Sequence, residues 1–288
     1  MKWMSYRWVY FILSGFLIAM GIYSMATTGF KVGVDFTGGA VITYQIKNWE
    51  KLETFKTTLM AGKEKPRSIQ ETSNGLLVAK FAELSTQQRN EINASLKEKN
   101  EGVFEEVKFE TVGPSMGREL IIKTVIALVI SSGLILLWVA IQFKSVKFGV
   151  SAVLAMLHDS LILLGSASFL GQFGLEVDYL FVTAMLTILS FSVHDTIVVY
   201  DRIREMGRTG NIEDVADRAI SGTMRRSINN SLTIIIMLIA LVVLGGESTK
   251  WFATALLVGT ISGTYSSPFV AVPILVTWEK LLERRKKG

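Results

Sequence analysis

The feature that most constrains this chain is a set of six long apolar stretches. Each spans about 17 residues or more with almost no charge, which suffices for a helix to cross the hydrocarbon core of a bilayer. Half of the 288 residues are hydrophobic, and the mean hydropathy is +0.40. The sequence therefore predicts a multi-pass membrane protein, with helices at about 9–27, 121–143, 148–170, 179–200, 228–244 and 251–278. Two prolines, Pro268 and Pro273, are expected to kink the last helix.

Residues 31–118, between the first two stretches, have the composition of a water-soluble domain. Asn48 is a suitable N-cap for one amphipathic helix, and Ser85 with Gln88 forms a capping box for another. Strands are expected at 40–46, 67–72, 76–81 and 103–112, the middle two joined by the hairpin signal Ser73-Asn74-Gly75. The order β-α-β-β-α-β is that of an α+β ferredoxin-like sandwich.

Basic residues set the expected orientation. Most basic residues in the loops after the soluble domain, and in the tail, gather on the side of the N-terminus, which predicts that this side is cytoplasmic. They are Lys144 and Lys147, the six arginines of the loop 201–226, and those of the tail 280–288. The soluble domain is then extracytoplasmic. Within the loop, Asn211 is expected to cap a short helix lying on the membrane surface.

The beginning of the chain has a competing interpretation, because Ser24-Met25-Ala26 resembles a signal-peptide cleavage site. The apolar run there is longer than a usual signal core, which favours an uncleaved segment, residues 1–30, made of a cytoplasmic N-terminus and the first membrane helix.

Composition also argues against several classes of function. The chain has no cysteine, so thiol chemistry and disulfides are excluded. Its small basic excess is explained by the loops, so no nucleic-acid partner is expected. The soluble domain shows no nucleophile–base set, and Gly62-Lys63 precedes Glu64 rather than the hydroxyl residue of a phosphate loop. We expect neither an enzyme nor a cofactor.

Asp195 lies inside the fourth stretch, about two turns before the charged cluster at 201–205. A carboxylate at that depth costs about 2.5–3.5 kcal/mol, so it is a candidate functional residue, with a buried packing role as the alternative. Arg226, at the start of the fifth stretch, has a comparable depth; an ion partner of Asp195 and a snorkelling interfacial arginine are equally compatible with its position.

The only two histidines also precede aspartates inside apolar stretches, as His158-Asp159 and His194-Asp195. Adjacent residues point about 100° apart on a helix, so neither pair forms a dyad on one face. No ligand spacing of three or four residues exists within a helix, and a metal site is disfavoured.

Several motifs together resemble the SecD/SecF family of the resistance-nodulation-division (RND) superfamily. They run in order along the whole chain and are similar to the family motifs GIDFTGG, VGP-x-x-G, NDTIVVFDRIRE, T-x-x-R-T-I-x-T-S and the last-helix motif. Here they stand at 33–39, 112–117, 194–205, 223–231 and 259–268.

The resemblance implies a fold and a set of site residues. The fold is the six-helix RND half-unit, and Asp195 and Arg226 are implied to serve proton-driven work. Asp159 fits a recurrent His-Asp pair and is a further relay candidate, as is His194, which stands where the family has Asn; Ser227 replaces a Thr. Structural motif positions are Gly33, Asp35, Gly38, Gly39, Gly113 and Pro114.

The resemblance also implies partners: SecD, the SecYEG channel and unfolded secreted chains, with YajC and YidC as further candidates. The chain is then a subunit in the bacterial inner membrane, surrounded by lipid, that couples H⁺ or Na⁺ flow to protein export. Two alternatives remain at this point: a stand-alone RND-type exporter of lipids or drugs, and a structural assembly factor that transports nothing.

Overall fold

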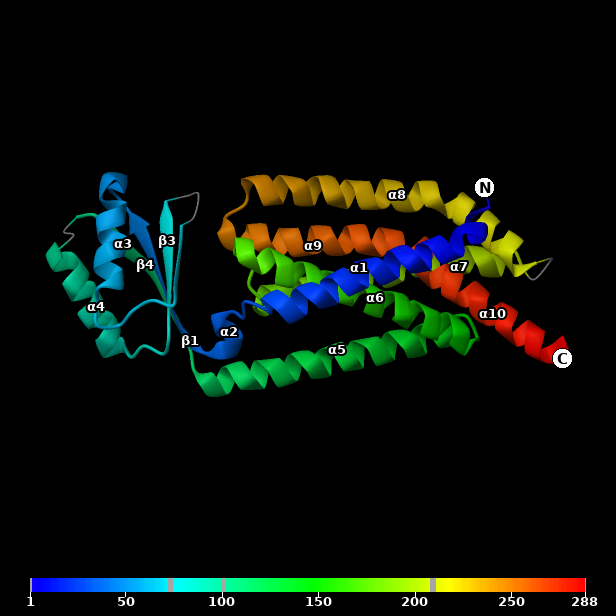
Figure 1. Ribbon diagram of the computed structural model, residues 1–288, viewed down its shortest axis with the longest axis horizontal. Helices are drawn as coiled ribbons and strands as arrows, with labels where there is room; N and C mark the ends of the chain where they lie inside the picture. Colours follow the sequence, from blue (N-terminus) through cyan, green and yellow to red (C-terminus); the bar gives the residue numbers. More distant parts are fainter. Residues whose placement is uncertain (1, 72–74, 100–101, 208–210, 288) are drawn as a thin grey trace. The chain divides into compact units, whose positions relative to one another are not determined.

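A computed structural model describes residues 2–71, 75–99, 102–207 and 211–287 (Figure 1). The chain divides into two compact units. One contains residues 1–31, 126–245 and 249–288; the other contains residues 32–125 with 246–248. Each unit is described by itself.

The first unit is a bundle of long helices that lie alongside one another (Figure 1). Six helical segments of the described chain are long and apolar enough to cross a membrane, which confirms the six expected spans. The helices are η1 (Trp3–Tyr6), α1 (Arg7–Thr28), α5 (Pro114–Gln142, from Ile126 on), α6 (Val146–Leu170), η3 (Gly171–Phe173), α7 (Tyr179–Glu205), α8 (Ile212–Leu244), α9 (Glu247–Ser266), η4 (Ser267–Ala271) and α10 (Val272–Lys287).

Two helices differ from expectation. The prediction of a separate surface helix after Asn211 is wrong. Asn211 does cap a helix, by accepting a hydrogen bond of 3.2 Å from the backbone N of Glu213, but this helix, α8, continues without a break to Leu244. Gly222 alone does not interrupt it, because a lone glycine costs only about 1 kcal/mol in a helix. The sixth span breaks into α9, the π-helical turn η4 and α10, and Pro268 and Pro273 are the second residues of η4 and α10.

The bundle packs around α6, α7 and the η4–α10 segment, whose apolar side chains share one core with the first turns of α8. Glycines allow the closest approach. A Cβ on Gly165 of α6 would lie 2.4 Å from the Cα of Gly21 on α1, and one on Gly259 of α9 would overlap Ile188 of α7. Small residues at these crossings are typical of membrane helices, which associate through close packing.

The second unit is a four-stranded antiparallel sheet of order β2-β3-β1-β4, with β1 (Gly39–Ile46), β2 (Ser68–Glu71), β3 (Leu76–Phe81) and β4 (Phe104–Val112). The helices α3 (Leu52–Met60) and α4 (Thr86–Lys99) pack on one face of the sheet, and η2 (Trp49–Lys51) precedes α3. This arrangement confirms the ferredoxin-like fold. The expected hairpin residues Ser73 and Asn74 lie outside the described part of the chain.

Alternation along β1 places Ile42 and Tyr44 in the core, fully buried against Phe55 of α3. Burial raises the pKa of the Tyr44 phenol, whose hydroxyl donates to Asn93 Oδ1 at 3.3 Å.

The expected motif residues shape the loops at the ends of this sheet. Gly33 and Gly38 cap the short α2 (Val34–Thr37), which contains Asp35, and Gly113 precedes Pro114 at the beginning of α5. Gly39 has φ +147°, and a Cβ there would lie 2.6 Å from the carbonyl oxygen of Phe81, so only glycine fits.

We expect Phe55→Ala to destabilise the second unit by about 3–5 kcal/mol, because it removes a fully buried ring that contacts Tyr44 and Phe104. Val107→Ala is the control, since Val107 is 58% exposed, and its effect should stay within about 0.5 kcal/mol. Hydrogen exchange of the sheet amides in the full chain measures both. Equal exchange in the two variants would contradict this core.

A second prediction concerns the crossing of α1 and α6. Gly165→Ala should destabilise the bundle by about 1–3 kcal/mol, because its Cβ meets backbone atoms of Gly21 that cannot swing aside. Gly133→Ala in α5 is the control: its Cβ would meet nothing within 4 Å, so the bundle should keep its stability. Thermal unfolding in detergent compares the two. If both variants unfold at the same temperature as the natural chain, the close crossing of α1 and α6 at Gly165 is contradicted.

Candidate ion-coupling site

Asp195 lies in the second half of α7, six residues before Asp201, and its side chain turns toward α8. It is only 9% exposed, and its Oδ2 accepts a hydrogen bond of 2.8 Å from Ser227 Oγ of α8. The α8 residue that meets the carboxylate is therefore Ser227 and not its neighbour Arg226. Of the two expected interpretations of Arg226, a direct ion pair with Asp195 is not formed: Arg226 is exposed and makes no salt bridge to it.

A small cavity of about 30 Å³ lies beside this carboxylate. Its lining includes His194 and Asp195 of α7, Asn230 of α8 and Thr264 of α9. A cavity of that volume admits a water molecule, and these side chains supply the polar partners that such a water requires. A water molecule or an ion in this cavity would meet these polar groups beside Asp195, although Phe191 and Ile234 also line it.

The other intramembrane aspartate, Asp159 of α6, is fully buried and enclosed by hydroxyl groups. Ser192 of α7 and Ser266 of α9 each donate to Asp159 Oδ2 at 2.6 Å, and Ser262 of α9 donates to Oδ1 at 2.6 Å. His158 Nδ1 lies 3.1 Å from the same Oδ1. Each carboxylate oxygen thus has two close polar neighbours, and the carboxylate joins three helices.

The enclosure continues into the π-helical turn η4. Ser267, its first residue, lies with its Oγ 3.0 Å from Thr196 Oγ1 and donates to the backbone oxygen of Ser192 at 3.2 Å. The turn is therefore fixed to α7 at the level of both aspartates, and π-helical turns are frequent at functional sites.

On the other side of the enclosure, His158 packs against Tyr265, with ring centroids 6.2 Å apart. The Tyr265 hydroxyl donates to the backbone oxygen of Tyr10 at 3.2 Å, and lies 3.3 Å from Ser14 Oγ, both on α1. His158 Nε2 is buried and has no hydrogen-bond partner among the residues that the structure describes.

The two aspartates lie in adjoining environments rather than in contact. Ser192, which binds Asp159, is three residues before Asp195, and positions three apart share one face of a helix. Gly263 of α9 helps α9 to approach Ser192 and Asp159 closely, because a Cβ at this position would lie 3.3 Å from Ser192 Cβ and 3.8 Å from Asp159 Oδ2. The polar groups thus form a series across the bundle, from His158 through Asp159 and Ser192 to Asp195 and Ser227.

The sequence indicated both aspartates as candidates, but not Ser192 or the hydroxyl enclosure. The available signal was spacing: Ser262 and Ser266 are four residues apart, and Ser192 precedes Asp195 by three. Spacing alone does not reveal which aspartate these hydroxyls meet.

Comparison with known proteins identifies relatives of this chain. Residues 91–281 match the family model described as "Protein export membrane protein SecD/SecF, C-terminal", and residues 23–48 match "SecD/SecF GG Motif". The protein translocase subunit SecF of Thermobaculum terrenum is 36% identical over 95% of this chain and 92% of the relative. That of Sebaldella termitidis is 37% identical over 100% of this chain and 93% of the relative.

A solved structure is similar as well. The crystal structure of SecDF, a translocon-associated membrane protein from Thermus thermophilus, superposes with a TM-score of 0.85 at 32% identity. The match covers 97% of this chain but only 39% of the SecDF chain. This chain thus spans about two fifths of that protein's length.

Ser266→Ala should destabilise the bundle by about 0.6 kcal/mol, and by no more than about 1.7, the range found for hydrogen bonds between membrane helices. The variant removes one of the three hydroxyls that hold Asp159. Ser160→Ala is the matched control, because Ser160 Oγ donates to the backbone oxygen of Met156 on its own helix. Denaturant unfolding in detergent measures both; equal midpoints would contradict the enclosure.

Proposed function

This chain belongs to the SecD/SecF family of protein-export membrane proteins, and from that membership we propose that it acts as an auxiliary subunit of the Sec protein-export machinery. Its relatives are named translocase subunits, which supports protein export over the export of small molecules. The chain is a multi-pass protein of the bacterial inner membrane. Its loop charges support cytoplasmic termini and an extracytoplasmic domain at about residues 31–118, with the membrane part at 119–279.

The proposed partner is SecD. The match covers only 39% of the solved SecDF chain, so the other three fifths of that chain have no counterpart in the matched residues. On α7 and α8, His194, Asn229 and Asn230 are exposed within the apolar spans. Lipid is a poor neighbour for such groups, which in membranes face other helices or water. A polar face on SecD helices would cover them and complete the surroundings of Asp195, and the pair would act on the SecYEG channel.

The proposed mechanism is ion-driven coupling, and the observation that carries it is the contrast between the aspartates. Asp159 is enclosed by donors, whereas Asp195 has one hydroxyl donor among the described residues and a small cavity beside it that several polar side chains line. Asp195 is thus the group that exchanges an ion, and its contact with Ser227 is the one that changes. Each charge that crosses the membrane delivers about 2.3 kcal/mol per 100 mV. Arg226 and His194 lie next to these residues and act on the ion from the exposed face, with Asp159 as a fixed member of the relay.

The external domain then moves in response. Loss of the charge on Asp195 weakens the Ser227 hydrogen bond and changes how α8 sits on α7. A few kcal/mol is enough to shift a two-state equilibrium decisively, so one or two ions in each cycle suffice to drive the movement that draws a secreted chain outward.

Asp195→Asn should assemble with SecD but lose the part of export that depends on the membrane potential, because the amide cannot carry the transferred charge. Proteoliposomes containing SecYEG, SecD and this chain measure export of a secreted reporter, under an imposed proton gradient and, separately, a sodium gradient. Glu205→Gln is the matched control: Glu205 is exposed on the same helix and pairs with Arg202 at 3.0 Å. Full potential-dependent export by an assembled Asp195→Asn variant would rule out this role.

A further inference from the structure

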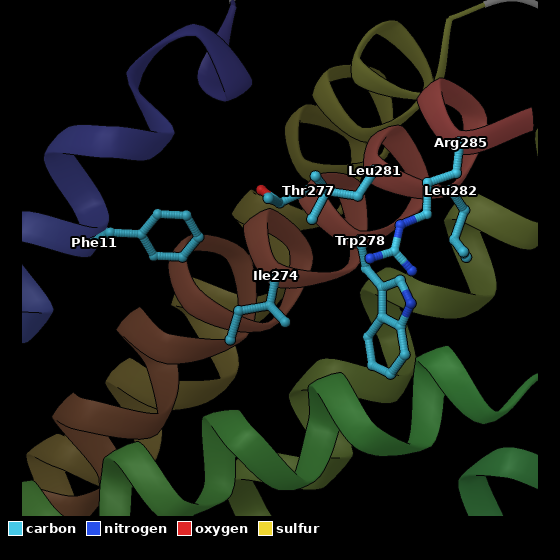
Figure 2. Close-up of a pocket in the computed structure, with 7 residues that line it drawn as sticks. All are labelled: Phe11, Ile274, Thr277, Trp278, Leu281, Leu282 and Arg285. Carbon is cyan, nitrogen blue, oxygen red and sulfur yellow. The ribbon is translucent and has the colours of Figure 1, made fainter. Parts of the chain in front are cut away.

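A groove of about 430 Å³ lies along α10 (Figure 2), and neither aspartate lines it. Figure 2 shows Phe11 of α1 at one end of it and Arg285 at the other. The α10 residues that line it are mostly three or four positions apart and form one stripe of the helix: Ile274, Thr277, Trp278, Leu281, Leu282 and Arg285.

The opposite side of α10 is already engaged by the bundle. Glu279 accepts a salt bridge from Lys147 of α6, and Lys280 pairs with Glu213 of α8. These two ion pairs fix the rotation of α10 about its axis. Its apolar stripe is turned away from these two ion pairs. Ile274 at the inner end still packs partly against the bundle core, whereas Leu281 remains 55% exposed.

The groove lies at the boundary between the membrane and water. The sixth span, Thr249–Arg285, has 37 residues, far more than the ~20 that cross a bilayer. Its last turns carry Glu283, Arg284 and Arg285, whereas Ile274 lies 11 residues earlier, about 16 Å deeper along the helix axis. Trp278, between them, is a residue type enriched at the level of lipid headgroups.

Arg285 is an exposed cation at the polar end of this groove. It forms no ion pair with any residue that the structure describes. A guanidinium matches a phosphate through paired hydrogen bonds. Apolar lining at one end and an available guanidinium at the other fit a molecule with a hydrocarbon chain and an anionic phosphate group.

We propose that the groove binds one molecule of an anionic phospholipid. An acyl chain lies against Phe11 and Ile274, and the headgroup phosphate binds Arg285. A peptide partner fits less well, because the apolar end of the groove lies at the depth of the acyl chains, which surround exposed apolar side chains there. The bound lipid links α1 to α10 next to the η4 turn.

The test uses the full chain, extracted in mild detergent and titrated with phosphatidylglycerol or phosphatidylcholine under native mass spectrometry. Arg285→Gln should bind phosphatidylglycerol about fivefold more weakly, corresponding to ~1 kcal/mol for one arginine at a membrane surface. Arg284→Gln is the matched control, with the same charge change about 100° away on the helix, and should bind as the natural chain does. Arg285→Lys should fall between them, since it keeps the charge but loses the fork.

Three results would each overturn the proposal. Equal weakening by the Arg284 and Arg285 variants means that only the overall charge matters, and equal affinity for the two lipids means that no anionic headgroup is selected. Because the chain has no cysteine, Leu281→Cys offers one crosslinking position. If a crosslinker attached to this cysteine reacts with another protein chain in native membranes, rather than with lipid, the groove is a binding site for that protein.

Discussion

The helix bundle depends on one buried carboxylate. Asp159 is fully withdrawn from water, where unpaired polar atoms are costly, and the hydroxyls of Ser192, Ser262 and Ser266 donate hydrogen bonds of 2.6 Å to it. Those donors come from two other helices, so the carboxylate is satisfied only when α6, α7 and α9 are in register. Close approach then requires small residues at the crossing, which is why Gly263 lies beside Ser192.

The same geometry gives the two aspartates different surroundings, which is the basis of the different tasks proposed for them. A carboxylate enclosed by four polar neighbours resists change, because any movement leaves several buried groups unpaired at once. Asp195 has one donor, Ser227, and a neighbouring cavity, so it can exchange partners at low cost. In the proposed mechanism, Asp159 fixes the helices and Asp195 responds to the ion. The response reaches the fixed cluster through α7, where Ser192 and Asp195 share a face.

Sequence alone predicted the parts of the structure that follow from local pattern. Apolar length is enough to locate membrane spans, and alternation with capping residues gave the order of strands and helices around Tyr44 and Phe55. It failed where tertiary context decides. Asn211 is a valid cap, but nothing local shows that α8 continues for 33 residues. The partners of Asp159 lie 33 to 107 positions away, so spacing on one helix does not identify them.

The π-helical turn η4 connects the region of the two aspartates with α10 and its groove. Ser266 and Ser267 fix this turn to Asp159, Thr196 and the backbone of α7, so a shift of α7 moves the beginning of α10. The salt bridges of Glu279 and Lys280 join α10 to α6 and α8. In the proposed cycle, a shift that enters at η4 therefore acts on α10, which carries Trp278 and Arg285. A lipid bound there resists the movement, and we therefore expect the composition of the membrane to affect how readily the ion site works.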